Sequence, residues 1–128
     1  MDSKSFLSDP FSRDLGITLT ASSPGQATLS LAITGKHLNS HGTVHGGVIF
    51  TLADVAFAVA SNSDDVPAVA INTSMTYMKA ISEGTLIAEA TEFSKNPRLG
   101  SYIVEVYDQD REKIAVFQGL AYRKTPRR

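Results

Sequence analysis

Hydrophobic and polar residues alternate regularly from residue 26 to residue 34. Ala27, Leu29, Leu31 and Ile33 fall on one side of an extended chain, and the intervening residues, mostly hydroxyl-bearing, fall on the other. A period of two residues is typical of a strand with one buried face. This stretch is therefore predicted to be a half-buried strand.

Similar patterns predict five further strands and two helices. The strands are expected at residues 17–22, 69–78, 85–93, 102–107 and 114–122, and the helices at residues 4–15 and 46–61. Pro24 with Gly25 and the polar run 108–111 mark turns. Because the late strands follow one another through short turns, we expect neighbouring strands to pair antiparallel.

The long predicted helix, residues 46–61, is apolar almost all round. Between Val48 and Ala60 only Thr51 and Asp54 are polar. A helix of this kind is buried on nearly every side. The predicted fold class is α+β, a single domain of residues 1–128 in which an antiparallel sheet wraps around one long central helix.

Composition narrows the classes of function. The chain has 128 residues, no Cys and a net charge of −1, so disulfides, thiolate metal sites and a cysteine nucleophile are excluded. A nucleic-acid binder would need a basic face, and the one dense basic run, Arg123, Lys124, Arg127 and Arg128, is interpreted as a solvated terminus. No apolar stretch reaches the roughly 18 to 20 residues of a membrane span, and the start lacks a signal-peptide pattern. We expect a cytoplasmic protein that binds neither nucleic acid nor membrane.

Asp54 is the unusual residue of the long helix. An ionised carboxylate is costly to bury without a partner, and no Lys or Arg lies within one helical turn of it. Asp54 could be a structural residue that hydrogen-bonds locally or faces solvent. It could also be a catalytic carboxylate, and the sequence at the helix start favours that interpretation.

The long helix begins with two glycines, Gly46 and Gly47. A helix start presents unpaired backbone N–H groups and a partial positive charge, and glycines let a ligand oxygen come close. Fixed N–H donors of this kind can stabilise an oxyanion. An ordinary glycine-rich junction between loop and helix is the structural alternative.

The distance along the helix separates these two features. Eight residues lie between Gly46 and Asp54, which at about 1.5 Å per residue is roughly 12 Å. A base and an oxyanion donor must both reach one carbonyl group within about 3 Å. Two antiparallel copies of the helix could meet this requirement, because each helix start would then face the middle of the other. If both features are functional, the smallest active unit is a homodimer.

The segment from residue 37 to residue 47, followed by Thr51-Leu52-Ala53-Asp54, resembles the signature of hotdog-fold thioesterases of the PaaI (phenylacetyl-CoA thioesterase) type. The resemblance implies an acyl-CoA substrate, a hotdog fold and a homotetramer built from dimers. It also implies that the backbone N–H of Gly46 donates to the thioester oxygen and that Gly47 lies beside the bound substrate. Asp54 of the partner subunit would activate water or attack directly, Asn39 would orient the water or the carboxylate, and His45 would support the loop.

The resemblance extends to the substrate's surroundings. Asn72 and Thr73 are the candidates for holding the water. Lys95 and Arg98 are the candidates for binding the CoA phosphates, with backbone contact near Gly100. The acyl pocket would be lined partly by Phe50, Phe57, Met75 and Tyr77, which suits an aryl-acetyl or medium acyl group. His37 and His41 are interpreted as loop residues, and 94–100 could equally be a solvated hairpin turn.

Two other classes of function stay open. A hotdog hydratase or dehydratase would pair a loop His with a helix carboxylate, although the block from Asn39 to Gly47 argues against it. A non-catalytic acyl-CoA-binding module usually carries a DNA-binding segment, for which we expect no room in this chain. No metal or redox cofactor is implied by the thioesterase resemblance, since CoA is part of the substrate.

Overall fold

The computed structural model describes residues 9–124. Its helices are α1 (Pro10–Leu15), the short 3-10 helix η2 (Gly35–His37) and α2 (Gly46–Ser61). Its strands are β1 (Ile17–Ser23), β2 (Gln26–Ala32), β3 (Ala68–Tyr77), β4 (Thr85–Lys95), β5 (Leu99–Tyr107) and β6 (Lys113–Arg123). The predicted bounds of α2 are confirmed, and the predicted leading helix begins only at Pro10 within the described residues.

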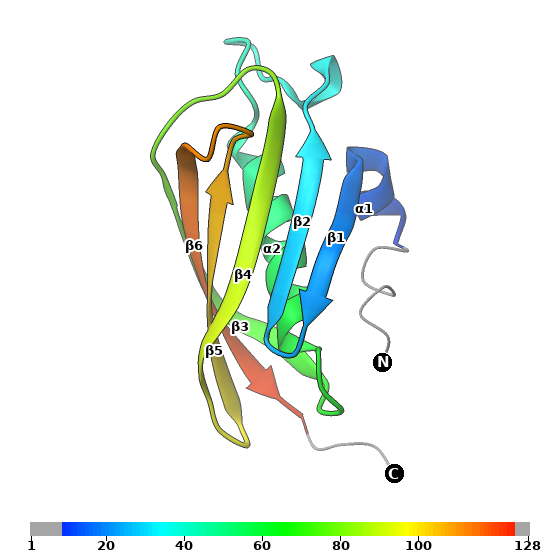
Figure 1. Cartoon of the computed structure of the whole chain (residues 1–128), viewed down its shortest axis with the longest axis vertical. Helices are drawn as coiled ribbons and strands as arrows, with labels where there is room; N and C mark the ends of the chain where they lie inside the picture. Colours follow the sequence, from blue (N-terminus) through cyan, green and yellow to red (C-terminus); the bar gives the residue numbers. More distant parts are fainter. Residues whose placement is uncertain (1–8, 125–128) are drawn as a thin grey trace.

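The six strands form one antiparallel sheet in the order β1-β2-β4-β5-β6-β3, and α2 lies along one face of it (Figure 1). Antiparallel pairing of the late strands is confirmed. The expectation that each pairs with its neighbour in sequence is wrong for β3, which pairs with β6. Short turns join β4 to β5 and β5 to β6, whereas residues 78–84 between β3 and β4 are long enough to cross the sheet.

Several strands extend beyond their predicted ends. β4 continues to Lys95 and β5 begins at Leu99, so the turn between them is only residues 96–98. Gly100 lies inside β5, paired with Lys95 on one side and Ala121 on the other. Gly100 is therefore a strand residue and not part of the hairpin turn considered for residues 94–100.

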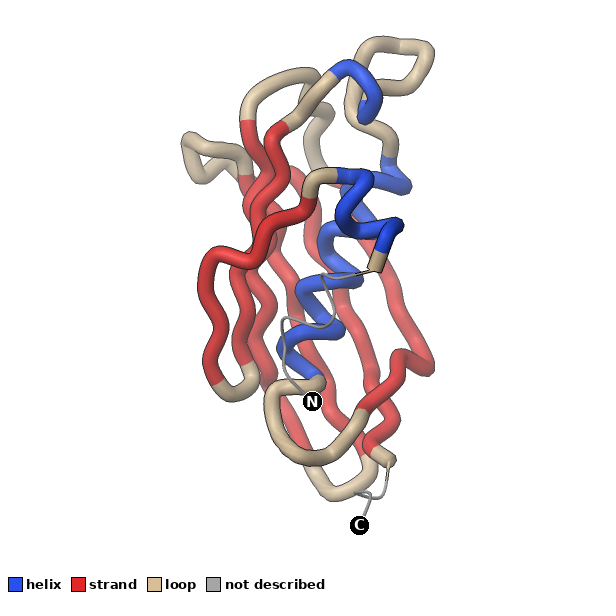
Figure 2. Tube along the Cα trace, turned by 90° about the vertical axis from the view of Figure 1, so that its right-hand side faces the viewer, coloured by secondary structure: helices blue, strands red, loops and turns tan. Residues whose placement is uncertain are grey.

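The core lies between α2 and the sheet. The alternating residues Ala27, Leu29 and Leu31 are buried as predicted. Helix α2 is buried on most of its surface, as expected, and one face is only half-buried; this face consists of Phe50, Thr51, Asp54, Val55 and Ala58. Strands flank α2, and α1 lies beside it (Figure 2). None of the helices within residues 9–124 is long and apolar enough to cross a membrane.

Gly119 lets β6 approach α2. A Cβ atom at this position would lie 2.8 Å from the Phe57 ring, which is 1% exposed and packs against Phe117 and Tyr102. We expect Gly119→Ala to lower the free energy of unfolding by about 1–3 kcal/mol, because the buried ring cannot move aside without strain. Urea unfolding measures this change.

Gly35→Ala is the matched control for Gly119→Ala. An added Cβ at Gly35 meets nothing within 4 Å, so its effect should stay within about 0.5 kcal/mol. Equal stability of the Gly119→Ala protein and the wild type would contradict the packing argument.

Candidate active site

Asn39 organises the loop that leads into α2. Its side-chain Oδ1 accepts hydrogen bonds from the backbone N–H groups of His41 (2.9 Å) and Thr43 (3.2 Å), while its Nδ2 donates to the Thr43 hydroxyl (3.1 Å). The backbone of Asn39 pairs with the Thr43 carbonyl and the Gly42 N–H. The amide is thus committed to loop structure, with one Nδ2 proton left for another partner.

The two histidines on either side of this loop differ in burial. His37 is 1% exposed; its Nε2 donates to the Leu15 carbonyl (2.7 Å), its Nδ1 accepts from the Thr34 N–H (3.0 Å), and its carbonyl accepts from the His45 N–H. The interpretation as a loop residue is therefore wrong for His37, which belongs to η2 and is a buried structural link between α1 and the start of α2. His45 is exposed and occupies the N-cap position of α2, where its side chain makes no capping bond.

Gly46 and Gly47 leave the start of α2 open. No hydrogen-bond acceptor within residues 9–124 pairs with either backbone N–H, as expected for the first turn of a helix. The Tyr77 hydroxyl donates to the Gly46 carbonyl (3.1 Å). Gly46 borders a hollow of about 330 Å³ with Thr43, Ile49 and Tyr77 among its lining residues.

Asp54 lies on the half-buried outer face of α2. It borders a groove of about 420 Å³, called the Asp54 groove, whose lining is Asp9, Phe11, Ser12, Phe50, Thr51, Asp54, Val55 and Ala58. Burial raises the pKa of the Asp54 carboxyl above its ordinary value of 3.8. Asp54 has no ion pair within the described part of the chain. The carboxylate is thus available to a reacting group.

Asp9 is the second carboxylate of the Asp54 groove. Its two oxygens accept from the Ser12 N–H (2.8 Å) and the Ser12 hydroxyl (3.0 Å), and the hydrogen bond from the Ser12 N–H is the main cause that lowers its pKa. Asp9 is occupied as the N-cap of α1, so Asp54 is the better base. No sequence pattern indicated that α1 borders this groove, because only the folded chain brings α1 to α2.

Gly46 and Asp54 do not share a hollow within one chain. Gly46 borders the 330 Å³ hollow and Asp54 borders the 420 Å³ groove, and none of the described residues lines both. This separation agrees with the roughly 12 Å expected from the helical rise. Within one chain, the helix start at Gly46 and the Asp54 carboxylate therefore lie at two separate places.

Lys95 and Arg98 border a third hollow, of about 780 Å³, beside the turn between β4 and β5. Arg123 and Lys124 border the same hollow, so four cations converge there; we call this hollow the basic hollow. The interpretation of the basic run as a solvated terminus is wrong for Arg123, which is half-buried at the end of β6. Lys124 is exposed, and its backbone N–H donates to the Pro67 carbonyl. Arg127 and Arg128 lie outside the described residues.

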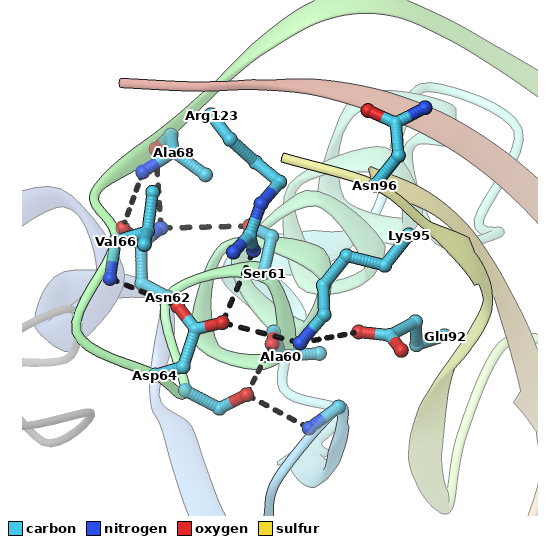
Figure 3. A network of polar contacts seen from close by, with 12 residues as sticks. Ala60, Ser61, Asn62, Asp64, Val66, Ala68, Glu92, Lys95, Asn96 and Arg123 are labelled. Carbon is cyan, nitrogen blue, oxygen red and sulfur yellow. Dashed lines mark hydrogen bonds and ion pairs between the residues drawn. The ribbon is translucent and has the colours of Figure 1, made fainter. Parts of the chain in front are cut away.

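Asp64 links two of these cations (Figure 3). Its carboxylate accepts from Lys95 Nζ (3.2 Å) and Arg123 Nη1 (3.1 Å), and Lys95 lies 3.7 Å from Glu92. Burial alone would raise the pKa of Asp64, but the hydrogen bonds from Val66, Lys95 and Arg123 lower it on balance. Arg98 makes no ion pair with any described residue, which leaves its charge for a ligand.

The remaining predicted residues are divided between β3 and the core. Asn72 is exposed and Thr73 half-buried on β3, next to an irregularity between Ala70 and Asn72. Phe57 is a core residue, so its assignment to the acyl pocket is wrong within this chain. Within residues 9–124 no three His, Asp or Glu side chains gather as they would around a metal ion.

Comparisons with known proteins point to one family. The family model described as Thioesterase superfamily matches residues 41–115. The Escherichia coli protein named acyl-coenzyme A thioesterase PaaI is 34% identical over 116 residues, which are 90% of this chain and 83% of that protein. A provisionally named esterase of Archaeoglobus fulgidus is 44% identical over 77% of this chain, and the match spans 65% of the archaeal protein's length.

A solved structure agrees with these sequence matches. The structure of the E. coli PaaI protein from the phenylacetic acid degradation operon superposes with a TM-score of 0.91 at 31% identity. The superposition covers 95% of this chain and 89% of the other. The similarity therefore extends well beyond the segment that the family model matches.

Proposed function

This chain belongs to the thioesterase superfamily and has the hotdog fold, and on that basis we propose that it hydrolyses acyl-CoA thioesters to the free acid and CoA. The observation that carries the proposal is Asp54, a half-buried carboxylate without an ion pair among the described residues, on the wall of a 420 Å³ groove. A carboxylate with a raised pKa in a groove is typical of catalytic sites.

The substrate class follows from the lining and from the relatives. Phe50, Val55 and Ala58 give the Asp54 groove an apolar wall, which suits an aryl-acetyl or medium acyl group. The E. coli relative is named an acyl-coenzyme A thioesterase and comes from the phenylacetic acid degradation operon. Phenylacetyl-CoA is therefore the first substrate to test.

The proposed reaction needs a water molecule and two protein groups. The Gly46 N–H donates to the thioester oxygen and stabilises the negative charge that develops on it. Asp54 either removes a proton from the attacking water or attacks the carbonyl carbon itself and forms an anhydride that water then cleaves. In both cases the C–S bond breaks and CoA leaves as the thiolate. The chemistry calls for no metal or redox cofactor.

Two subunits supply one active site in this proposal. Figure 1 shows the start of α2 and the turn between β4 and β5 at opposite ends of the molecule. Gly46 and Asp54 border different hollows. An antiparallel partner brings its Gly46 to the Asp54 of the first chain. β3 is an edge strand with Val69 and Ile71 exposed (42% and 54%), which suits pairing with a second copy.

The CoA end of the substrate occupies the basic hollow in this proposal. Lys95, Arg98, Arg123 and Lys124 border it, and Arg and Lys side chains bind phosphate groups through charge-assisted hydrogen bonds. Asn72 or Thr73 on β3 holds the attacking water, and Asn39 and His45 keep the Gly46 loop in place. Assembly of dimers into a tetramer and a cytoplasmic location complete the proposal.

Release of free thiol from acyl-CoA substrates tests the proposed function. We expect turnover across a panel of phenylacetyl-CoA, medium-chain acyl-CoA and acetyl-CoA, with crotonyl-CoA hydration measured in parallel. Hydration without thiol release would favour a hydratase. Binding without any turnover would favour an acyl-CoA-binding module, and either result would contradict the proposal.

A further inference from the structure

The helix α1 forms one wall of the Asp54 groove. Asp9, Phe11 and Ser12 belong to α1 and its N-cap, and the opposite wall is the outer face of α2. The groove's volume of about 420 Å³ lies within the roughly 300–1,000 Å³ of small-molecule sites. A group that reaches Asp54 through this groove must therefore pass along α1.

The wall that α1 provides is fixed at both ends. At its start, Asp9 caps the helix through Ser12, whose side chain is buried (2% exposed). At its end, Gly16 takes the left-handed conformation (φ 88°) and the buried His37 donates to the Leu15 carbonyl. A six-residue helix would be marginal in isolation, so these contacts hold it in one position.

Phe11 is the apolar side chain of this wall that packs least against the described residues. Its side chain is 64% exposed, although it borders the groove. On the other wall, Phe50 is half-buried and its ring packs edge-on against Phe117, with centroids 5.5 Å apart. Two aromatic rings, one from each helix, thus line the approach to the Asp54 carboxylate.

We propose that Phe11 is a specificity-determining residue that contacts the acyl group of the substrate across the Asp54 groove from Phe50. This assignment rests on the proposed thioesterase function and deepens it. An apolar or aromatic acyl group would cover the Phe11 ring and remove its surface from water. A short acyl group such as acetyl would not reach the ring, so Phe11 would matter only for the larger substrates.

The test compares Phe11→Ala with the wild type on phenylacetyl-CoA and acetyl-CoA. We expect kcat/KM for phenylacetyl-CoA to fall about tenfold, as losses of pocket contact usually do, and kcat/KM for acetyl-CoA to stay nearly unchanged. Ala is a good helix former and Phe11 is exposed, so the melting temperature should not fall.

Phe93→Ala is the matched control, because Phe93 is similarly exposed (59%) but lies on β4 and does not border the groove. Its selectivity should equal that of the wild type. The role of Phe11 would be overturned if Phe11→Ala left the ratio of kcat/KM between phenylacetyl-CoA and acetyl-CoA unchanged, including by equal losses on both substrates. The same change of this ratio in Phe93→Ala would also overturn it. A wild type that turns over neither substrate would overturn the proposed function and this assignment together.

Discussion

Asp54→Asn is expected to lower kcat for thioester hydrolysis about a thousandfold, the size of effect that follows from loss of a general base or nucleophile. Asparagine keeps the shape of the side chain but can neither accept the water's proton nor attack the carbonyl. The substrate should still bind, so KM should change much less than kcat. Steady-state thiol release with phenylacetyl-CoA measures both constants.

Asp65→Asn is the matched control for this variant. Asp65 is an exposed carboxylate beyond the end of α2 and borders none of the three hollows described above, so its loss should leave the rate unchanged. An Asp54→Asn protein that retains wild-type kcat would remove Asp54 from the reaction and with it the main support for the proposed function.

The Asp54→Asn variant should lose activity but not stability. Because burial raises the folded-state pKa of Asp54 above 3.8, the unfolded chain binds fewer protons at this carboxyl in the interval just above pH 3.8. The folded state therefore loses stability as the pH rises through that interval. Asp54→Asn removes this loss, so its melting temperature at neutral pH should equal or exceed that of the wild type. The difference should disappear below pH 3.8.

The catalytic rate has its own pH dependence. Only the ionised Asp54 can act as base or nucleophile, so kcat/KM should fall on the acid side. The midpoint of that fall should lie above 3.8, because burial raises the pKa of this carboxyl. Loss of activity without loss of stability would mark Asp54 as a residue kept for chemistry and not for the fold.

Local patterns were sufficient for the elements that local physics decides. The apolar run that defines α2 begins after a glycine pair and ends where polar residues return, and its predicted bounds, Gly46 and Ser61, are those of the structure. The alternation in β2 predicted its buried face for the same reason, because the period of a strand is visible in adjacent residues.

Contacts between distant residues were beyond the sequence patterns. Nothing in the composition of β3 indicates that it pairs with β6 and not with β4. The wall that Phe11 provides depends on how α1 lies against α2. Arg123 is held beside Lys95 because Asp64, 59 residues away from Arg123 in sequence, accepts from both. Such pairings arise from tertiary packing, and the periodicity of a single segment carries no information about them.

The candidate site also combines residues that the sequence indicates with residues that only the folded chain brings together. Gly46 and Asp54 became candidates because each stands out in its own segment, and Asn39 became one through the family resemblance. The hollow that gathers Lys95, Arg98, Arg123 and Lys124 combines a turn with the end of β6, and only its first two residues were predicted. The resemblance supplied candidate residues, whereas the folded chain shows which residues lie around them.

Mixing two inactive variants should restore activity if the active site lies between subunits. Asp54→Asn removes the carboxylate, and Gly46→Pro removes the proposed oxyanion donor. Pro is tolerated at the first position of a helix, where the N–H has no intrahelical partner. The extended ψ of His45 (135°) also suits a following Pro. Each variant alone should lose at least about a hundredfold in kcat.

In a mixed dimer, one site combines the intact Gly46 of the first chain with the intact Asp54 of the second, and the other site carries both changes. Random exchange makes about half of the dimers mixed, with one working site of two, so about a quarter of wild-type activity should return. Mixing either variant with the Asp54→Asn/Gly46→Pro double variant leaves every site defective and is the control. If differently tagged chains form mixed dimers that stay inactive, Gly46 and Asp54 act within one chain or not at all. Restored activity would instead explain why a single chain has these two groups in separate hollows: the thioester is held by the helix start of one subunit and cleaved with the carboxylate of the other.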